Sequence, residues 1–364
     1  MSVLTRDRNY GCRINDDYTY RGMRLMVMEN DLLRISLLLD KGTTIYEYLY
    51  KPLDIDFMFL NNQGVRSPNQ LPTSAHSLGF LTDVYDGGWH EQLPNSGNPS
   101  NFAGTEQGLH GEVCLLPWHW TVLEDTPDRI CARLWVRTYR TPFLLEKKLT
   151  LERGKAILSI DERVTNESSV VQHFMWGHHP TLGEAFLDES CVIDIPAGKG
   201  RTLPRWSPDN WLAGEAEFTW PFAPAEGGGV LDLSRIPPRE TCQEDAAYLT
   251  DLTAGWYAVT NKRRRVGFGQ VWPATVFPYV ILWAVYGGTP GYPWYRQNYN
   301  LALEPQSSIP EGLSDSVLAG TALTLEGGDS LNLSFKTVVY TGVTGVAHIS
   351  PEGEITPREV DGGL

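Results

Sequence analysis

Short apolar runs separated by turn residues constrain the fold of this chain more than any other feature. Runs rich in Val, Ile, Leu, Tyr and Trp alternate with Gly, Pro, Asn and Asp, and a long helical period is almost absent. This spacing is typical of all-β sandwiches and barrels. Residues 130–139 and 158–164 alternate apolar and polar side chains, which indicates strands with one buried and one wet face. The sequence therefore predicts an all-β protein.

The domain organisation follows from the even distribution of these runs. With 364 residues the chain can bury a large core. No low-complexity linker and no internal repeat interrupts it. We therefore expect residues 1–345 to form a single large β-sandwich domain. Residues 346–364 are polar and are expected to form a tail over the surface.

Charge and composition exclude several classes of function. The formal charge of −14 argues against a nucleic-acid partner, because such binding depends on Lys and Arg neutralising phosphates. No apolar run is long enough to span a bilayer, so a membrane partner is not expected. The first residues lack the basic region and apolar core of a secretory signal, and a cytoplasmic location is the expectation.

Two other features favour plain structural interpretations. The five cysteines are scattered, odd in number and without a Cys-x-x-Cys pair, so neither a disulfide framework nor a zinc site is indicated. The basic cluster at residues 262–265 lies between two strand-like runs. It could be an anion site, but a solvated hairpin tip is the expected structure.

Three places carry residues suited to acid–base chemistry. Residues 174–183 read Phe-Met-Trp-Gly-His-His-Pro-Thr-Leu-Gly. Adjacent residues of a strand point to opposite faces, so only one of His178 and His179 can face a given pocket. His110 lies in a Gly-Leu-His-Gly turn. Glu304 follows Leu-Ala-Leu in an apolar strand, where carboxylates are seldom buried without a partner or a task.

The loop from residue 72 to residue 108 is a candidate binding loop. Long loops in compact domains are usually binding loops or disordered segments. This one holds Asp86, Trp89, Glu91 and Asn95, whose side chains can bond or stack on a polar ligand. A turn held by its own side chains would explain Asp86 to Glu91 equally well.

The order of these motifs resembles that of the aldose 1-epimerase, or galactose mutarotase-like, superfamily. The similarity runs through most of the chain. It is carried by His110-Gly111, Leu158-Ser-Ile with Val164-Thr-Asn166, His179-Pro180, Phe277-Pro278-Tyr279, Leu303-Glu304-Pro305-Gln306 and Leu325-Glu-Gly-Gly-Asp329. The chain departs from the family at His178, where the family has Asn, and at Thr181-Leu182, where it has Tyr-Phe.

The resemblance implies a large antiparallel β-sandwich, the galactose mutarotase-like supersandwich, with a cleft for a small-molecule carbohydrate. It implies Glu304 as general base, His179 as general acid and His110 as a substrate-positioning residue, with no cofactor and no metal. The family's substrate arginine and aspartate have no clear counterpart here. The remaining substrate-binding candidates are His178, Trp89, Glu91, Asp86, Asn95 and Trp176.

The chemistry is consistent with these residue types. Interconverting sugar anomers requires a proton taken from the C1 hydroxyl and another given to the ring oxygen, which a carboxylate and a histidine can do without a cofactor.

Four alternatives or additions stay open. A non-catalytic carbohydrate-binding or sensing protein could use the same scaffold. A metal site built from His110, His178 or His179, and Glu304 ranks last, because no His-x-His spacing supports it. A lyase or a hydrolase on a related sandwich is also possible. A hydrolase would need two suitably spaced carboxylates, which Asp86, Glu91 and Glu304 do not exclude. A homodimer is left open as the assembly.

Overall fold

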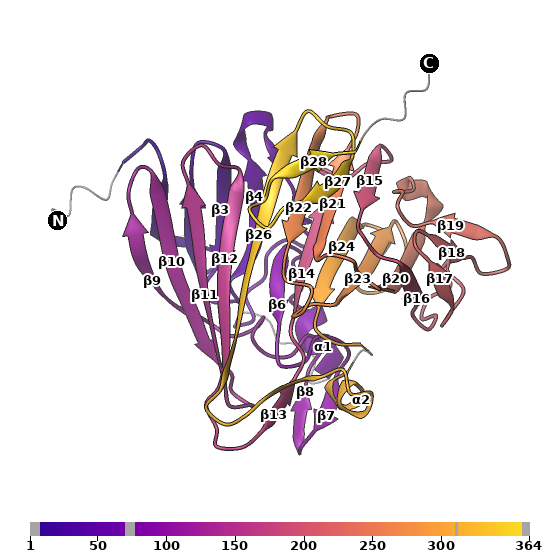
Figure 1. Ribbon diagram of the computed structural model, residues 1–364, viewed down its shortest axis with the longest axis horizontal. Coiled ribbons are helices and arrows are strands. Elements are labelled where there is room, and N and C mark those ends of the chain that lie inside the picture. The colour runs from indigo at the N-terminus through magenta and orange to yellow at the C-terminus, as the bar shows by residue number, and fades with distance from the viewer. Residues whose placement is uncertain (1–7, 70–76, 310–311, 359–364) are drawn as a thin grey trace. The chain divides into compact units, whose positions relative to one another are not determined.

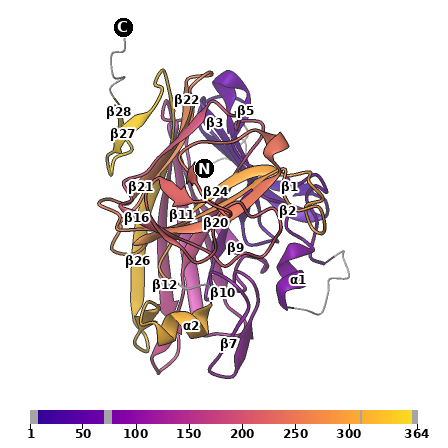
Figure 2. The same ribbon diagram turned by 90° about the vertical axis from the view of Figure 1, so that its right-hand side faces the viewer.

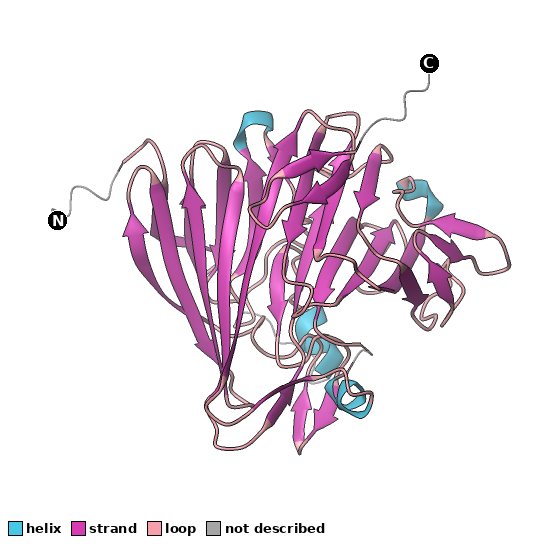
Figure 3. Cartoon of the chain, viewed as in Figure 1, coloured by secondary structure: helices cyan, strands magenta, loops and turns pink. Residues whose placement is uncertain are grey.

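The computed structural model describes residues 8–69, 77–309 and 312–358 of the chain. Its regular structure consists almost entirely of strands (Figure 3). The described residues also contain two short α-helices, α1 (Ser77–Thr82) and α2 (Leu313–Leu318), and two 3-10 turns, η2 (Lys51–Leu53) and η3 (Arg239–Thr241). In these ranges no helix is long and apolar enough to cross a membrane. The predicted all-β class is confirmed.

The chain divides into two compact units. The first comprises Met1–His178 with Ser308–Phe335, and the second comprises His179–Ser307 with Lys336–Leu364. The expectation of a single domain over residues 1–345 stays a prediction.

The first unit contains two groups of antiparallel strands. One is a meander in sequence order, in which β5 and β6 both pair with β4: β1 (Arg13–Tyr20), β2 (Met23–Glu29), β3 (Leu33–Leu38), β4 (Thr44–Tyr50), β5 (Ile55–Asp56) and β6 (Trp89–Gln92). The other lies side by side in Figure 1: β9 (His119–Asp125), β10 (Arg129–Arg137), β11 (Phe143–Glu152) and β12 (Ile157–Asn166).

The alternation predicted for residues 158–164 is present in β12. Leu158, Ile160, Glu162 and Val164 are buried, whereas Asp161 and Arg163 between them are exposed. The Glu162 carboxylate therefore occupies a buried position where the alternation predicts an apolar side chain.

Two small hairpins complete the first unit. They are β7 (Ser100–Phe102) with β8 (Thr105–Gln107), and β13 (Gln172–Phe174) with β25 (Leu323–Leu325). Helix α2 lies beside β7 in both views (Figures 1 and 2), where the Ser314 N–H donates to Ser100 Oγ at 2.9 Å.

The second unit also contains two antiparallel sheets. One has its strands in this order, starting from the His179 end of β14: β14 (Gly177–Gly183), β24 (Tyr299–Gln306), β23 (Tyr279–Tyr286), β20 (Gln243–Thr250), β16 (Lys199–Thr202), β17 (Glu217–Thr219), β18 (Phe222–Pro224) and β19 (Val230–Asp232). The other contains β15 (Cys191–Asp194), β21 (Trp256–Asn261), β22 (Val266–Val271) and β26 (Ser330–Thr341) from Lys336 onward.

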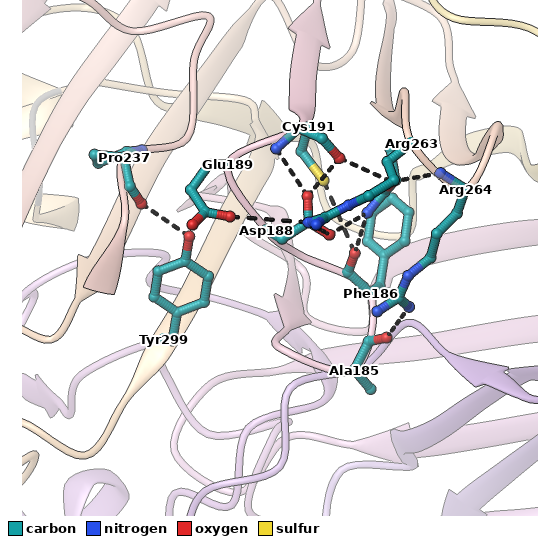
Figure 4. Close-up of polar contacts among 11 residues, drawn as sticks. Ala185, Phe186, Asp188, Glu189, Cys191, Pro237, Arg263, Arg264 and Tyr299 are labelled. Carbon is teal, nitrogen blue, oxygen red and sulfur yellow. Dashed lines mark hydrogen bonds and ion pairs between the residues drawn. The ribbon is translucent and has the colours of Figure 1, made fainter. Parts of the chain in front are cut away.

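The basic cluster at residues 262–265 forms the tip of the β21–β22 hairpin, as predicted. Its arginines bond within the protein (Figure 4). Arg263 Nη2 lies 2.7 Å from Asp188 Oδ2, and Arg264 Nη1 donates to the Ala185 carbonyl oxygen at 2.5 Å. These contacts attach the tip to the loop before β15.

The prediction of a polar tail after residue 345 is wrong for its first part. Val346–Ile349 (β27) and Ile355–Pro357 (β28) pair as an antiparallel hairpin. Val346 and Ile349 are buried. These two apolar side chains, although they lie in a polar stretch of sequence, attach β27 to the second unit. The Val346 N–H donates to Asp194 Oδ2 at 2.8 Å, and Arg358 forms an ion pair with the same carboxylate.

Candidate active site

The second unit brings together the two residues predicted as acid and base. His179 lies on β14 and Glu304 on the neighbouring strand β24. His179 Nε2 is 3.3 Å from Glu304 Oε1, and both side chains are buried. The sequence places them 125 positions apart, and the strand order accounts for the contact. Their catalytic roles stay proposals.

The surroundings of His179 determine its protonation. Burial lowers the pKa of His179 to about 4, so the imidazole is neutral at pH 7. Thr181 Oγ1 lies 2.9 Å from His179 Nδ1, so one departure from the family pattern directly contacts the candidate acid. Gln306 Nε2 donates to Glu304 Oε2 at 3.3 Å.

The sheet register adds residues to this face of the second unit. Residues opposite each other in an antiparallel pair, and those two positions away, share a face. Glu304 lies opposite Ile281, which puts Trp283 on the same face, and Trp283 lies opposite Ala246, which adds Glu244. The ring centroids of His179 and Trp283 are 5.6 Å apart. Sequence reasoning missed Glu244, because its polar neighbours Gln243 and Asp245 make the start of β20 look like an exposed segment.

His178 has a different set of partners, as expected for the neighbour of His179 in a strand. Trp89 Nε1 donates to His178 Nδ1 at 3.2 Å, and His178 Nε2 lies 3.0 Å from Glu162 Oε2. An indole N–H can only donate, so Nδ1 must accept and Nε2 must carry the proton that is donated to Glu162. Burial lowers the pKa of His178 to about 4, in agreement with this neutral form.

Glu91 and Glu162 extend this contact into a buried network. Lys147 Nζ donates to Glu91 Oε1 at 2.9 Å. The two carboxyl groups hydrogen-bond to each other, which requires a proton between them. Burial and the nearby charge of Glu162 raise the pKa of Glu91 to about 8, so Glu91 holds this proton at pH 7. The charge of Glu162 is then balanced by Lys147.

We tested whether this network fits a metal ion. Ligand atoms of Glu91, Glu162 and His178 lie within 4.8 Å of one another, the only such group in the described ranges. A metal needs the lone pair of His178 Nε2, but the bond from Trp89 places a proton on that atom. The ammonium of Lys147 already occupies the neighbourhood of Glu91. These residues do not fit a metal, and the set differs from the one considered from the sequence.

His110 is the centre of a second histidine contact in the first unit. His110 Nδ1 lies 2.9 Å from His90 Nε2, and the two rings stack with centroids 5.2 Å apart. The backbone of His110 is left-handed, with φ 61°. His90 was not predicted as a site residue. It points away from Trp89 and Glu91, its neighbours in β6, because side chains alternate along a strand.

Three further candidates lie in the framework of the first unit. Asp86 Oδ2 accepts from Lys41 Nζ at 2.6 Å, and both groups are buried. Asn95 donates to the carbonyl oxygens of residues 97, 98 and 108, and its own oxygen accepts from the Leu313 N–H at 2.9 Å. Trp176 is fully buried. Residues 72–76 of the predicted binding loop lie outside the described residues. The ligand-binding roles of all these residues stay predictions.

Residues 20–339 match the family described as Domain of unknown function (DUF4432). The chain belongs to the DUF4432 family. The description of the family carries no activity, and no curated protein matches this DUF4432 chain.

Solved structures give the fold of this DUF4432 protein. A putative aldose 1-epimerase from Klebsiella pneumoniae has a TM-score of 0.71 at 16% identity, over 90% of this chain and 83% of the other. A galactose mutarotase-like protein from Clostridium acetobutylicum has a TM-score of 0.60 at 13% identity, over 91% of this chain and 99% of the other. A galactose mutarotase related enzyme from Lactobacillus acidophilus has a TM-score of 0.58 at 14% identity, over 86% of this chain and 97% of the other.

These likenesses show the fold alone. The DUF4432 chain has the antiparallel β-sandwich fold of the galactose mutarotase-like proteins, as the motif order predicted.

Proposed function

We propose that this protein is an aldose 1-epimerase-like isomerase that interconverts the anomers of a small-molecule carbohydrate without a cofactor. The contact between His179 Nε2 and Glu304 Oε1, 3.3 Å apart and buried on one sheet of the second unit, is the observation that supports it most.

The distance suits the reaction. The C1 hydroxyl oxygen and the ring oxygen are bonded to the same carbon, so the acid and the base must be neighbours. Glu304 takes the hydroxyl proton while the bond between C1 and the ring oxygen breaks. The electron pair on the ring oxygen takes a proton from the imidazolium form of His179, which becomes a neutral imidazole. C1 becomes an aldehyde carbon, the C1–C2 bond rotates, and the same transfers in reverse close the ring on the other face.

A second candidate function is a non-catalytic carbohydrate-binding or sensing protein. It is favoured by the neutral state of His179 at pH 7, since a strong acid needs the imidazolium form. When it is charged, however, His179 is a strong proton donor, and it lies 3.3 Å from the candidate base. We therefore place the isomerase first.

An NMR exchange experiment tests the proposal. It measures interconversion of α and β anomers for a panel of aldoses with native protein and with Glu304→Gln. Glu304→Gln keeps the shape of the side chain but removes the base, so the catalysed rate should fall by about 10²- to 10⁴-fold.

The matched control is Glu217→Gln, which changes an exposed carboxylate of the same unit and should leave the rate unchanged. Absence of acceleration by native protein, together with bound sugar in saturation-transfer spectra, would favour the binding protein instead.

A further inference from the structure

Two loops of the second unit carry aromatic side chains that the proposed proton transfers do not use. The loop after β16 contains Trp206 and Trp211, which are 48% and 40% exposed. The loop between β23 and β24 contains Trp294, which is partly buried. Tryptophans that expose so much surface, when gathered together, mark a place where a ligand or partner binds.

Trp206 and Trp294 converge on one carboxylate. Both indoles hydrogen-bond to Glu244, which also accepts from Thr289 Oγ1. Glu244 is only 4% exposed, and burial raises its pKa to about 7. The indole N–H lies at the edge of the ring, so this bond fixes the edge and leaves the ring face available for stacking.

The loop that carries Trp206 is attached to the same strand. Asn210 Oδ1 accepts from the backbone N–H of Trp206 at 2.7 Å and of Ser207 at 2.8 Å. Asn210 Nδ2 donates to the Glu244 carbonyl oxygen at 2.5 Å. The position of Trp206 is thus set by buried polar contacts, although the indole itself is half exposed.

Trp294 continues a row of rings that starts at the candidate acid, His179. The ring centroids of Trp294 and Trp283 are 5.8 Å apart, and those of Trp283 and His179 are 5.6 Å apart. Sheet register places Trp283, Glu244 and Glu304 on one face. A ligand whose reacting ring lies at His179 and Glu304 therefore has an aromatic surface beside it.

The charges of these loops favour a neutral ligand. Arg205 Nη1 lies 2.7 Å from Glu226 Oε1, and Arg296 Nη2 lies 3.2 Å from Asp209 Oδ2. Both cations are paired within the protein, so a phosphate group would have to displace a carboxylate. Sugar rings present apolar C–H faces, which stack on indoles without requiring a charge.

We propose that Trp206 and Trp294 form a subsite for a second sugar ring, and that the substrate is a reducing disaccharide or longer oligosaccharide. The reducing ring lies at His179 and Glu304, and the next ring stacks on the two indoles. This inference rests on the proposed function for the reaction of the first ring.

Two readouts test the subsite. The first is NMR anomer exchange of glucose and galactose compared with maltose, cellobiose and lactose. The second is binding of the methyl glycosides of the same disaccharides, which cannot open and so report binding alone. Both are measured with native protein, Trp206→Ala, Trp206→Phe and Phe222→Ala. Phe222 is a matched control, since it is an aromatic residue of the same unit with 58% exposure.

We expect Trp206→Ala to lower kcat/KM and affinity for one or more disaccharides by about tenfold, and to leave monosaccharide rates unchanged. Trp206→Phe keeps an aromatic face but loses the bond to Glu244, and should fall between native protein and Trp206→Ala. Phe222→Ala should match native protein.

The two proposals fail in different ways. If Trp206→Ala changes monosaccharides and disaccharides alike, or changes neither, the subsite is overturned while the isomerase stands. If no sugar shows faster exchange, the isomerase fails, and binding of the methyl disaccharides decides the subsite. Binding that depends on Trp206 then supports it, and absent or Trp206-independent binding overturns it.

Discussion

His178 and His179 are neighbours in the chain and both are neutral because of burial, yet they contact different groups. The Trp89 indole fixes the tautomer of His178, which then donates to a carboxylate. His179 lies against the Glu304 carboxylate on one side and the Thr181 hydroxyl on the other. The two histidines therefore contact different carboxylates, Glu162 for His178 and Glu304 for His179.

The proton on Glu91 makes the stability of the network depend on pH. Because burial raises the pKa of Glu91 to about 8, the native state binds a proton that the unfolded state has lost above pH 4.5. This contribution is full below pH 4.5 and is lost as pH rises through 8. In Glu91→Gln the amide oxygen can still accept from Lys147 and the amide N–H can donate to Glu162, without a titrating proton. We expect the free energy of unfolding of native protein to fall by about 3 kcal/mol more than that of Glu91→Gln between pH 6 and pH 9.

Chemical denaturation at several pH values measures this difference. Glu167→Gln is the control, because Glu167 belongs to an exposed ion pair with Arg137 and should follow native protein. Parallel curves for native protein and Glu91→Gln would show that Glu91 is ionised in the folded state.

The turn that carries His110 depends on the glycine after it. Gly111 has φ 74°, and a Cβ atom there would lie 2.4 Å from the Leu93 carbonyl oxygen. Gly111→Ala combines a left-handed backbone with a backbone clash, and we expect a loss of about 2 kcal/mol or more in the free energy of unfolding. Ring signals of His90 and His110 in NMR spectra should shift, since their contact depends on this turn.

Gly104→Ala separates the two causes. Gly104 has φ 78° but nothing within 4 Å of its added Cβ, so this variant measures the backbone cost alone. Equal losses in the two variants would mean that the close approach to Leu93 contributes nothing.

The strands could be predicted from the sequence because each is encoded by a local pattern. The alternation along β12 and the opposite directions of His178 and His179 are examples. The network around Glu162 left a signal that was not used, since Glu162 is in phase with Ile160 and Val164, and Lys147 with Leu145 and Leu149. The convergence of Trp206 and Trp294 on Glu244 left no signal in the sequence, because it depends on how two irregular loops attach to one strand.

At the scale of the whole molecule, buried carboxyl groups outweigh buried histidines in the proton balance. Burial raises the pKa of Asp56 and Asp245 to about 6, of Glu244 to about 7 and of Glu91 to about 8. His178 and His179 act in the opposite direction. Near pH 7 the native state then holds more protons than the unfolded chain, so unfolding should release about one proton and stability should fall as pH rises from 6 to 8.

Calorimetric unfolding at pH 7 in two buffers of different ionisation enthalpy measures this release. Proton uptake on unfolding would contradict it and would mean that the histidines dominate the balance.

The hairpin formed by β27 and β28 has a practical consequence for anyone who shortens this protein. Composition suggests a cut at residue 345, yet that cut removes both the N–H and the guanidinium that the buried Asp194 carboxylate requires. A truncated chain would leave this carboxylate uncompensated and would uncover the apolar surface beneath Val346 and Ile349. A chain shortened for crystallisation should therefore keep every residue up to and including Arg358.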